Sequence, residues 1–195
     1  MNIKLGLVTF LMLITTGVQA ATITFDSPPF VGGGRMETEY LENGVAFTGL
    51  FAHYGTQVPG SASNTSSGLI KLLYGGEMRI AMADSGLFTL ESVDLSEYSY
   101  LFIQPTTVTF TGYHSDGSSN TQSFVTDGIF DSIGGVNDFE TFFFSSAFDD
   151  LTYVDIDSVV FAMDNLSIRP VPVPAAGLLF FSGLLGMLGF VKRRR

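Results

Sequence analysis

Apolar and polar side chains alternate in short runs through the middle of the chain, and this period of two is that of a β-strand with one buried face. In the run 107–113, Val108 and Phe110 fall on one face and three threonines on the other. The turn signal Ser115-Asp116-Gly117 follows, so the run 121–126 is predicted to return as a hairpin partner.

Similar runs predict the other strands, at 21–26, 44–49, 69–73, 78–82, 88–95, 139–145, 153–161 and 161–168. The run 153–161 predicts either two short strands or one bent strand. Clusters of Gly, Ser, Asn and Asp separate the runs, with turns expected at 74–76 and 84–86 and surface loops at 32–34 and 60–68. About nine or ten short strands favour an all-β, antiparallel, jelly-roll-like β-sandwich over a parallel α/β sheet.

The first twenty residues have a different pattern. Lys4 precedes the apolar stretch 5–14, and the small residues of Val18-Gln19-Ala20 follow. A basic start, a short apolar run and a small-residue exit are typical of a secretory signal peptide, with cleavage predicted between Ala20 and Ala21. An uncleaved N-terminal anchor or a buried core helix is the alternative.

The last twenty-five residues, 171–195, contain a proline-punctuated linker, an apolar run and a basic end. The apolar run 175–191 has no charged residue, and a helix of that length would span roughly 25 Å, near the lower limit for crossing a bilayer. The four basic residues that follow are expected to stay in the cytoplasm: Lys192, Arg193, Arg194 and Arg195. One domain, 21–170, is then expected outside the cytoplasm, anchored at the inner membrane.

The charge of this domain is strongly unbalanced. It holds all nineteen acidic residues of the chain and only four basic ones, Arg35, Lys71, Arg79 and Arg169, for a net charge of about −15. Such a charge disfavours nucleic acid as a partner. The many phenylalanines and the low total charge indicate a folded domain. The absence of cysteine excludes disulfides, thiol catalysis and zinc-thiolate sites, so packing must supply the stability.

The tail resembles the PEP-CTERM sorting signal of Gram-negative bacteria. Pro172 and Pro174 flank Val173, and the predicted helix and the arginine-rich end follow in the order of that family. Val173 stands where the family generally has a glutamate. The resemblance implies an exosortase-like membrane protease as a processing partner and release to the cell surface or matrix after cleavage.

The domain is similar to those that precede such tails, in five short segments: 23–26, 40–47, 88–95, 108–113 and 161–168. This resemblance implies a secreted, matrix-associated β-sandwich like the carbohydrate-binding jelly rolls, and it names no ligand.

Catalytic signatures are scarce. His53 and His114 are the only histidines, and no Gly-x-Ser-x-Gly elbow accompanies them. Nineteen acidic residues allow many carboxylate pairs, so their presence alone does not indicate a glycosidase. We therefore predict no enzymatic activity, with a hydrolase using an unrecognised acidic site as an alternative.

Two carboxylate pairs are candidates for a structural calcium. Asp155 and Asp157 would share one strand face, about 6.6 Å apart along the strand, and calcium prefers such oxygen ligands. Asp26 and Asp164 would meet if the first and last strands were neighbours. The alternatives are exposed strand carboxylates for the first pair and turn hydrogen bonding, together with Asn165, for the second.

Seven tyrosines could either stack against sugars or pack in the sheet: Tyr40, Tyr54, Tyr74, Tyr98, Tyr100, Tyr113 and Tyr153. We expect an exported, membrane-anchored or sorted envelope or matrix protein without enzymatic activity. A carbohydrate-binding module for extracellular polysaccharide is the second hypothesis, and a sheet face lined by tyrosine and polar side chains would favour it.

Overall fold

The computed structural model describes residues 20–26, 34–55, 68–71, 76–98, 104–130, 138–157 and 159–172. These residues form eleven antiparallel strands and one short 3-10 helix, η1 (Ser146–Phe148). The strands are β1 (Ala21–Ile23), β2 (Arg35–Glu42), β3 (Val45–Tyr54), β4 (Gly68–Lys71), β5 (Met78–Met82), β6 (Phe88–Ser96), β7 (Thr107–His114), β8 (Ser119–Val125), β9 (Glu140–Phe143), β10 (Leu151–Ile156) and β11 (Phe161–Pro170). The prediction of an all-β, antiparallel fold is confirmed.

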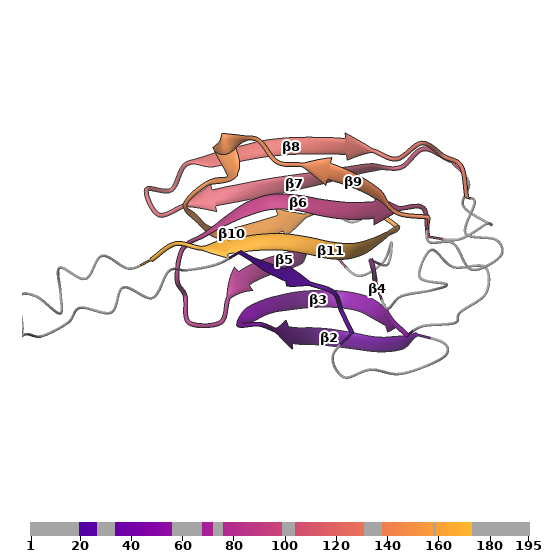
Figure 1. Ribbon diagram of the computed structural model, residues 1–195, viewed down its shortest axis with the longest axis horizontal. Helices are drawn as coiled ribbons and strands as arrows, with labels where there is room; N and C mark the ends of the chain where they lie inside the picture. Colours follow the sequence, from indigo (N-terminus) through magenta and orange to yellow (C-terminus); the bar gives the residue numbers. More distant parts are fainter. Residues whose placement is uncertain are drawn as a thin grey trace, which may run out of the picture.

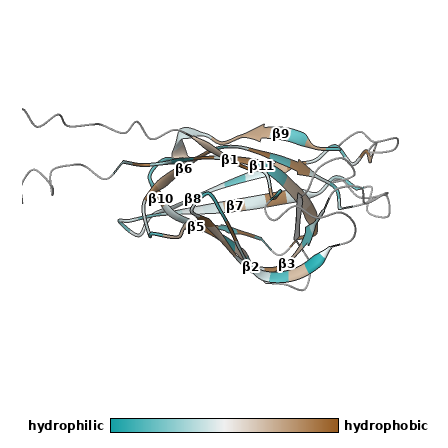
Figure 2. Ribbon diagram, turned by 60° about the horizontal axis from the view of Figure 1, so that its bottom comes forward, coloured by the Kyte–Doolittle hydropathy of each residue, from teal (hydrophilic) through white to brown (hydrophobic). Residues whose placement is uncertain are grey.

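The strands form one sheet that closes on itself. Their order is β8-β7-β10-β5-β3-β4-β11-β6-β9, with β1 added to β11 and β2 to β3 (Figure 1). A further pairing of Leu151 in β10 with Phe88 in β6 turns six of these strands into a ring. In Figure 2, β6 and β11 lie on one side of the interior and β5 and β3 on the other. The result is a barrel-like domain.

Phenylalanine fills the interior. Val108 and Phe110 are fully buried, as the alternation in β7 predicts, while the threonines that alternate with them face outward. Phe25 and Phe47 meet edge to face at 5.2 Å between ring centroids, and Phe110 meets Phe144 at 5.1 Å. Burying each such ring contributes about 1.5–3 kcal/mol, so a domain without cysteine has a large apolar contribution to its stability.

Most predicted strands are present with shifted ends. The run 78–82 is β5, and the predicted hairpin is β7 and β8, joined through a turn in which Gly117 has a φ of 85°. The run 153–161 is neither one bent strand nor two short strands of its own. It covers the second part of β10, which begins at Leu151 and ends at Ile156, and the first residue of β11, Phe161. The predicted loops 32–34 and 60–68 and the turn 74–76 lie largely outside the described residues.

Strand β2 was not predicted. Of its eight residues only Tyr40 is buried, so the strand has little of the apolar alternation that marks the others. Asn43 and Gly44 join it to β3 with φ values of 50° and 80°, the left-handed pair of a two-residue hairpin. This Asn-Gly signal is the one that could have revealed β2.

The ends of the chain lie mostly outside the described residues. The predicted signal peptide up to residue 19, Val173 and Pro174, the predicted helix 175–191 and the basic residues 192–195 all lie outside them. Within the described part, no helix has the length and apolar character needed to cross a membrane. Ala21 opens β1 and pairs with Ile168 near the end of β11, so the chain enters and leaves the barrel side by side.

Glu42 ties β1 to the β2-β3 hairpin. Its carboxylate accepts hydrogen bonds from the Phe25 amide at 2.9 Å, the Thr24 amide at 3.2 Å and the Tyr40 hydroxyl at 2.6 Å. Phe25 has a left-handed φ of 56°, and its carbonyl oxygen is hydrogen-bonded to Nε2 of buried His53. One carboxylate therefore satisfies the backbone where β1 ends.

We expect Glu42→Ala to lower the free energy of unfolding by about 1–3 kcal/mol, because two backbone amides and a hydroxyl lose their acceptor. Glu39→Ala is the control, since Glu39 lies on the exposed side of the same strand, and its effect should stay within about 0.5 kcal/mol. Urea denaturation measures both. Equal midpoints for the two variants would show that the tie contributes nothing.

The turn between β7 and β8 makes a pH-dependent contribution to the stability of the fold. Hydrogen bonds from the Ser118 hydroxyl at 2.6 Å and the Ser118 amide at 2.9 Å hold the pKa of Asp116 below its ordinary value. A pKa that is lowered in the folded state stabilises the fold at pH values above the ordinary pKa, and this contribution is lost as the pH falls through the lowered value.

We expect Ser118→Ala to raise the pKa of Asp116 in a carboxyl NMR titration, whereas Ser119→Ala should leave it unchanged. The same pKa in both variants would contradict this assignment.

Candidate functional site

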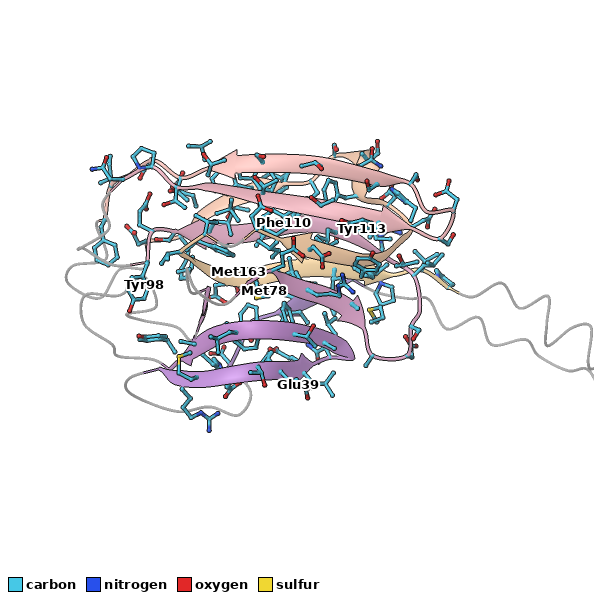
Figure 3. The ribbon with its side chains drawn as sticks, turned by 180° about the vertical axis from the view of Figure 1, so that it is seen from behind. Glu39, Met78, Tyr98, Phe110, Tyr113 and Met163 are labelled. Carbon is cyan, nitrogen blue, oxygen red and sulfur yellow. The ribbon has the colours of Figure 1, made fainter. Side chains whose placement is uncertain are left out.

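The outward face of β5, β10 and β7 carries an ordered array of side chains, here called the tyrosine face: Arg79, Tyr113, Tyr153 and Asp155. Tyr153 in β10 lies opposite Tyr113 in β7 and Ala81 in β5. In the next outward row, Asp155 lies between Thr111 and Arg79. Because side chains alternate along a strand, both rows point away from the phenylalanine core. Figure 3 shows Tyr113 on this part of the barrel.

The array is held by contacts between its members. The rings of Tyr113 and Tyr153 stack with centroids 4.5 Å apart and planes 19° from parallel. The guanidinium carbon of Arg79 lies 4.0 Å from the Tyr153 ring centroid, a cation-π contact. Nε and Nη2 of Arg79 donate to the two oxygens of Asp155 at 2.7 and 2.9 Å. This bidentate bond raises the pKa of Arg79, so the guanidinium stays charged and fixed.

Small and hydroxyl side chains surround the stack. Ala81 and Ala46 continue the tyrosine row towards β2, and Ser119 ends it on the edge strand β8. In the rows beside it, Thr111 and Thr121 lie 3.4 Å apart between hydroxyl oxygens. An aromatic stack flanked by hydroxyls on a sheet surface offers both apolar contact and hydrogen bonds to a ligand.

A second group of polar side chains, here called the acidic cluster, consists of Glu97, Asp127 and Glu140. One carboxylate oxygen from each lies within 4.8 Å of the others. Glu97 directly follows β6, Asp127 follows β8 and Glu140 opens β9, so three strand ends meet here. Glu97 is fully buried, Glu140 half-buried and Asp127 exposed.

Backbone amides of the loop after β8 donate hydrogen bonds to one oxygen of each of the three carboxylates. Glu97 Oε1 accepts from the Gly128 amide at 2.8 Å and from the Thr126 hydroxyl, and Glu140 Oε1 accepts from the Asp127 amide at 2.9 Å. Gly128 has a φ of 78°, and a Cβ there would lie 2.4 Å from Pro105 Cδ, so the loop requires glycine. Burial, and then the charges of Asp127 and Glu97, raise the pKa of Glu140, against the lowering effect of the Asp127 amide.

The predicted calcium residues are placed differently. Asp155 is bound to Arg79, and Asp157 is exposed just after β10. The expected neighbourhood of the first and last strands is present, because β1 pairs with β11. Asp26 is exposed after β1, and the buried Asp164 accepts from the Asn165 amide at 2.7 Å, the hydrogen bonding that was the alternative to calcium.

None of these four aspartates belongs to a group of three or more acidic or histidine side chains that could share a cation, within the residues the structure describes. Calcium at those positions stays a prediction.

The two histidines make local hydrogen bonds. His53 is buried and contacts the Phe25 carbonyl and the Tyr40 ring, whose centroid lies 5.0 Å from its own. His114, at the end of β7, has Nε2 2.9 Å from Asn120 Nδ2. Both contacts are those of structural side chains in and beside strands.

The comparisons with known proteins give little. No family model and no curated protein matches the chain. A solved structure described as "Structural analysis of an exo-beta-agarase" is 10% identical, with a TM-score of 0.40, over 80% of this chain and 26% of that one. The chain thus spans about a quarter of the length of that protein, and a likeness of this strength assigns neither family nor activity.

Proposed function

We propose that this chain is an exported, membrane-anchored or sorted protein without enzymatic activity, whose β-domain is a jelly-roll-like β-sandwich that binds extracellular polysaccharide. The observation that carries the proposal is the stacked pair Tyr113 and Tyr153, locked beside the Arg79 and Asp155 pair on an outward sheet face.

The chemistry of this face suits a sugar. A pyranose ring has apolar CH faces that pack on aromatic rings and hydroxyls that exchange hydrogen bonds with serine, threonine and guanidinium groups. The side chains of the tyrosine face already hold one another, so little conformational entropy remains to be lost on binding. The domain charge of about −15 repels anionic polymers, which favours a neutral polysaccharide.

Export and anchoring rest on the two ends of the sequence. Residues 1–20 resemble a signal peptide, and 171–195 supply a spanning segment with a basic end and a PEP-CTERM-like motif. Since Ala21 pairs with Ile168, one end of the barrel would face the membrane. The acidic cluster would then lie at the other end, since Glu97 is one strand length from Phe88, about 30 Å.

Binding to polysaccharide should depend on the tyrosine stack. We expect the full-length chain to be retarded in affinity electrophoresis through dextran or soluble cellulose derivatives more than through alginate. Tyr113→Ala should weaken the retardation about tenfold or more, a loss of at least about 1.4 kcal/mol. Phe143→Ala is the matched control, because Phe143 is 72% exposed on the edge strand β9.

Equal loss in the two variants, or none in Tyr113→Ala, would count against the tyrosine face. Release of shortened oligosaccharides that disappears in Asp127→Asn would instead support the hydrolase alternative.

Processing is tested by mass spectrometry of the mature protein from a bacterium that carries an exosortase. We expect the N-terminus at Ala21 and loss of residues 175–195. An intact N-terminus would contradict export through a cleaved signal. Retention of 175–195 would contradict sorting by cleavage while leaving membrane anchoring intact.

A further inference from the structure

The acidic cluster has no ion-pair partner among the residues that the structure describes. Residues 21–172 contain only four basic side chains. Arg35 pairs with Glu37, Arg79 with Asp155, and Arg169 with Glu91. None of the three clustered carboxylates takes part in an ion pair within the part of the chain that the structure describes.

One oxygen of the cluster is buried and without a hydrogen-bond donor. Glu97 is 0% exposed, and its Oε1 takes both available donors, so Oε2 has no partner in the described structure. A buried carboxylate oxygen in this state costs several kcal/mol unless a cation or a proton compensates it. Oε2 belongs to the same carboxylate that lies against Asp127 and Glu140. The unsatisfied oxygen thus belongs to a member of the acidic cluster.

The remaining oxygens are also available to a ligand. Glu140 uses Oε1 for the Asp127 amide, and Asp127 uses Oδ1 for the Ile129 amide at 2.7 Å. The second oxygen of each makes no hydrogen bond to the described residues. Each carboxylate is therefore oriented by a backbone amide through one oxygen and keeps the other for a cation.

We propose that Glu97, Asp127 and Glu140 form a calcium site. Carboxylate oxygens are hard ligands, which suit Ca²⁺ or Mg²⁺ rather than zinc or copper. Oxygens bound to one Ca²⁺ at about 2.3–2.6 Å can be up to about 5 Å apart, and the observed limit of 4.8 Å satisfies this without rearrangement. Magnesium binds at about 2.0–2.1 Å in near-ideal octahedral geometry, so three carboxylates from three different strand ends suit the more flexible coordination of calcium better.

The exposed position of Asp127 gives water access to one side, so solvent can complete the six to eight ligands that calcium takes. The ion would join the end of β6, the end of β8 and the start of β9. Its binding would thus stabilise the end of the barrel opposite the start of β1 and the end of β11. This site is separate from the tyrosine face, and its test is independent of sugar binding.

The test is equilibrium dialysis of the purified full-length chain with ⁴⁵Ca²⁺, together with thermal unfolding. We expect one ion per chain and a rise in Tm of about 5–10 °C when free calcium is 100 times Kd. Asp127→Asn and Glu140→Gln should each weaken binding at least tenfold. In Asp127→Asn the oxygen that accepts from Ile129 is kept, so this variant tests the ion rather than the loop.

Glu39→Gln is the matched control, because it removes an exposed carboxylate elsewhere, and it should bind calcium as the native chain does. No calcium bound at 10 mM would overturn the proposal, as would native affinity in both cluster variants. Calcium binding that appears only in Lys71→Met would identify Lys71 as the counter-charge and overturn it too. An equal Tm response to magnesium would overturn the choice of calcium.

Discussion

The closure of the sheet is the constraint on which the rest of this domain depends. An open sheet of this length would leave its inner face of phenylalanines in water, and the chain has no cysteine with which to hold the layers together. The pairing of Leu151 with Phe88 brings β10 against β6, and Phe47, Phe110 and their neighbours form one buried cluster behind the sheet. Because both paired residues are themselves fully buried, closure and core formation are one event. A large Phe core therefore takes the place of covalent cross-links.

Closure of the sheet also determines where polar side chains can come together to form a site. The inside of the barrel is occupied by apolar side chains, so only the outer faces and the strand ends remain. On the outer face, register brings together residues distant in sequence, as with Arg79 and Asp155. At the strand ends, carboxylates meet because three connections converge there, and backbone amides orient one oxygen of Glu97 and one of Glu140. The two candidate sites are thus the two kinds of place a closed sheet leaves free.

The sequence predicted most strands but not the sites, for a physical reason. Strand formation depends on local alternation, which residues such as Val108 and Phe110 display within a few positions. Strand β2 was not predicted because Tyr40 is its only buried residue and its glutamates leave no apolar alternation to recognise. The tyrosine stack depends on β7 pairing with β10, and no local pattern sets Tyr113 opposite Tyr153. The pairing of Asp155 with Arg79 has no local signal either, because the two residues lie on different strands. Glu97, Asp127 and Glu140 have no motif spacing: the pairing of β6 with β9 brings Glu97 near Glu140, and the loop at Gly128 adds Asp127.

The tyrosine face and the acidic cluster differ in how their carboxylate charges are balanced. On the tyrosine face the single buried carboxylate, Asp155, is neutralised by Arg79, so this surface carries no net charge of its own and can accept a neutral ligand. At the acidic cluster three carboxylates share no basic side chain among the described ion pairs, and one is fully buried. Three of the four basic residues of the domain are arginines, and each of them pairs with a carboxylate outside the cluster. Arg79 thus fixes the geometry of the tyrosine face, whereas the strand-end carboxylates are the groups that a cation from solution would compensate.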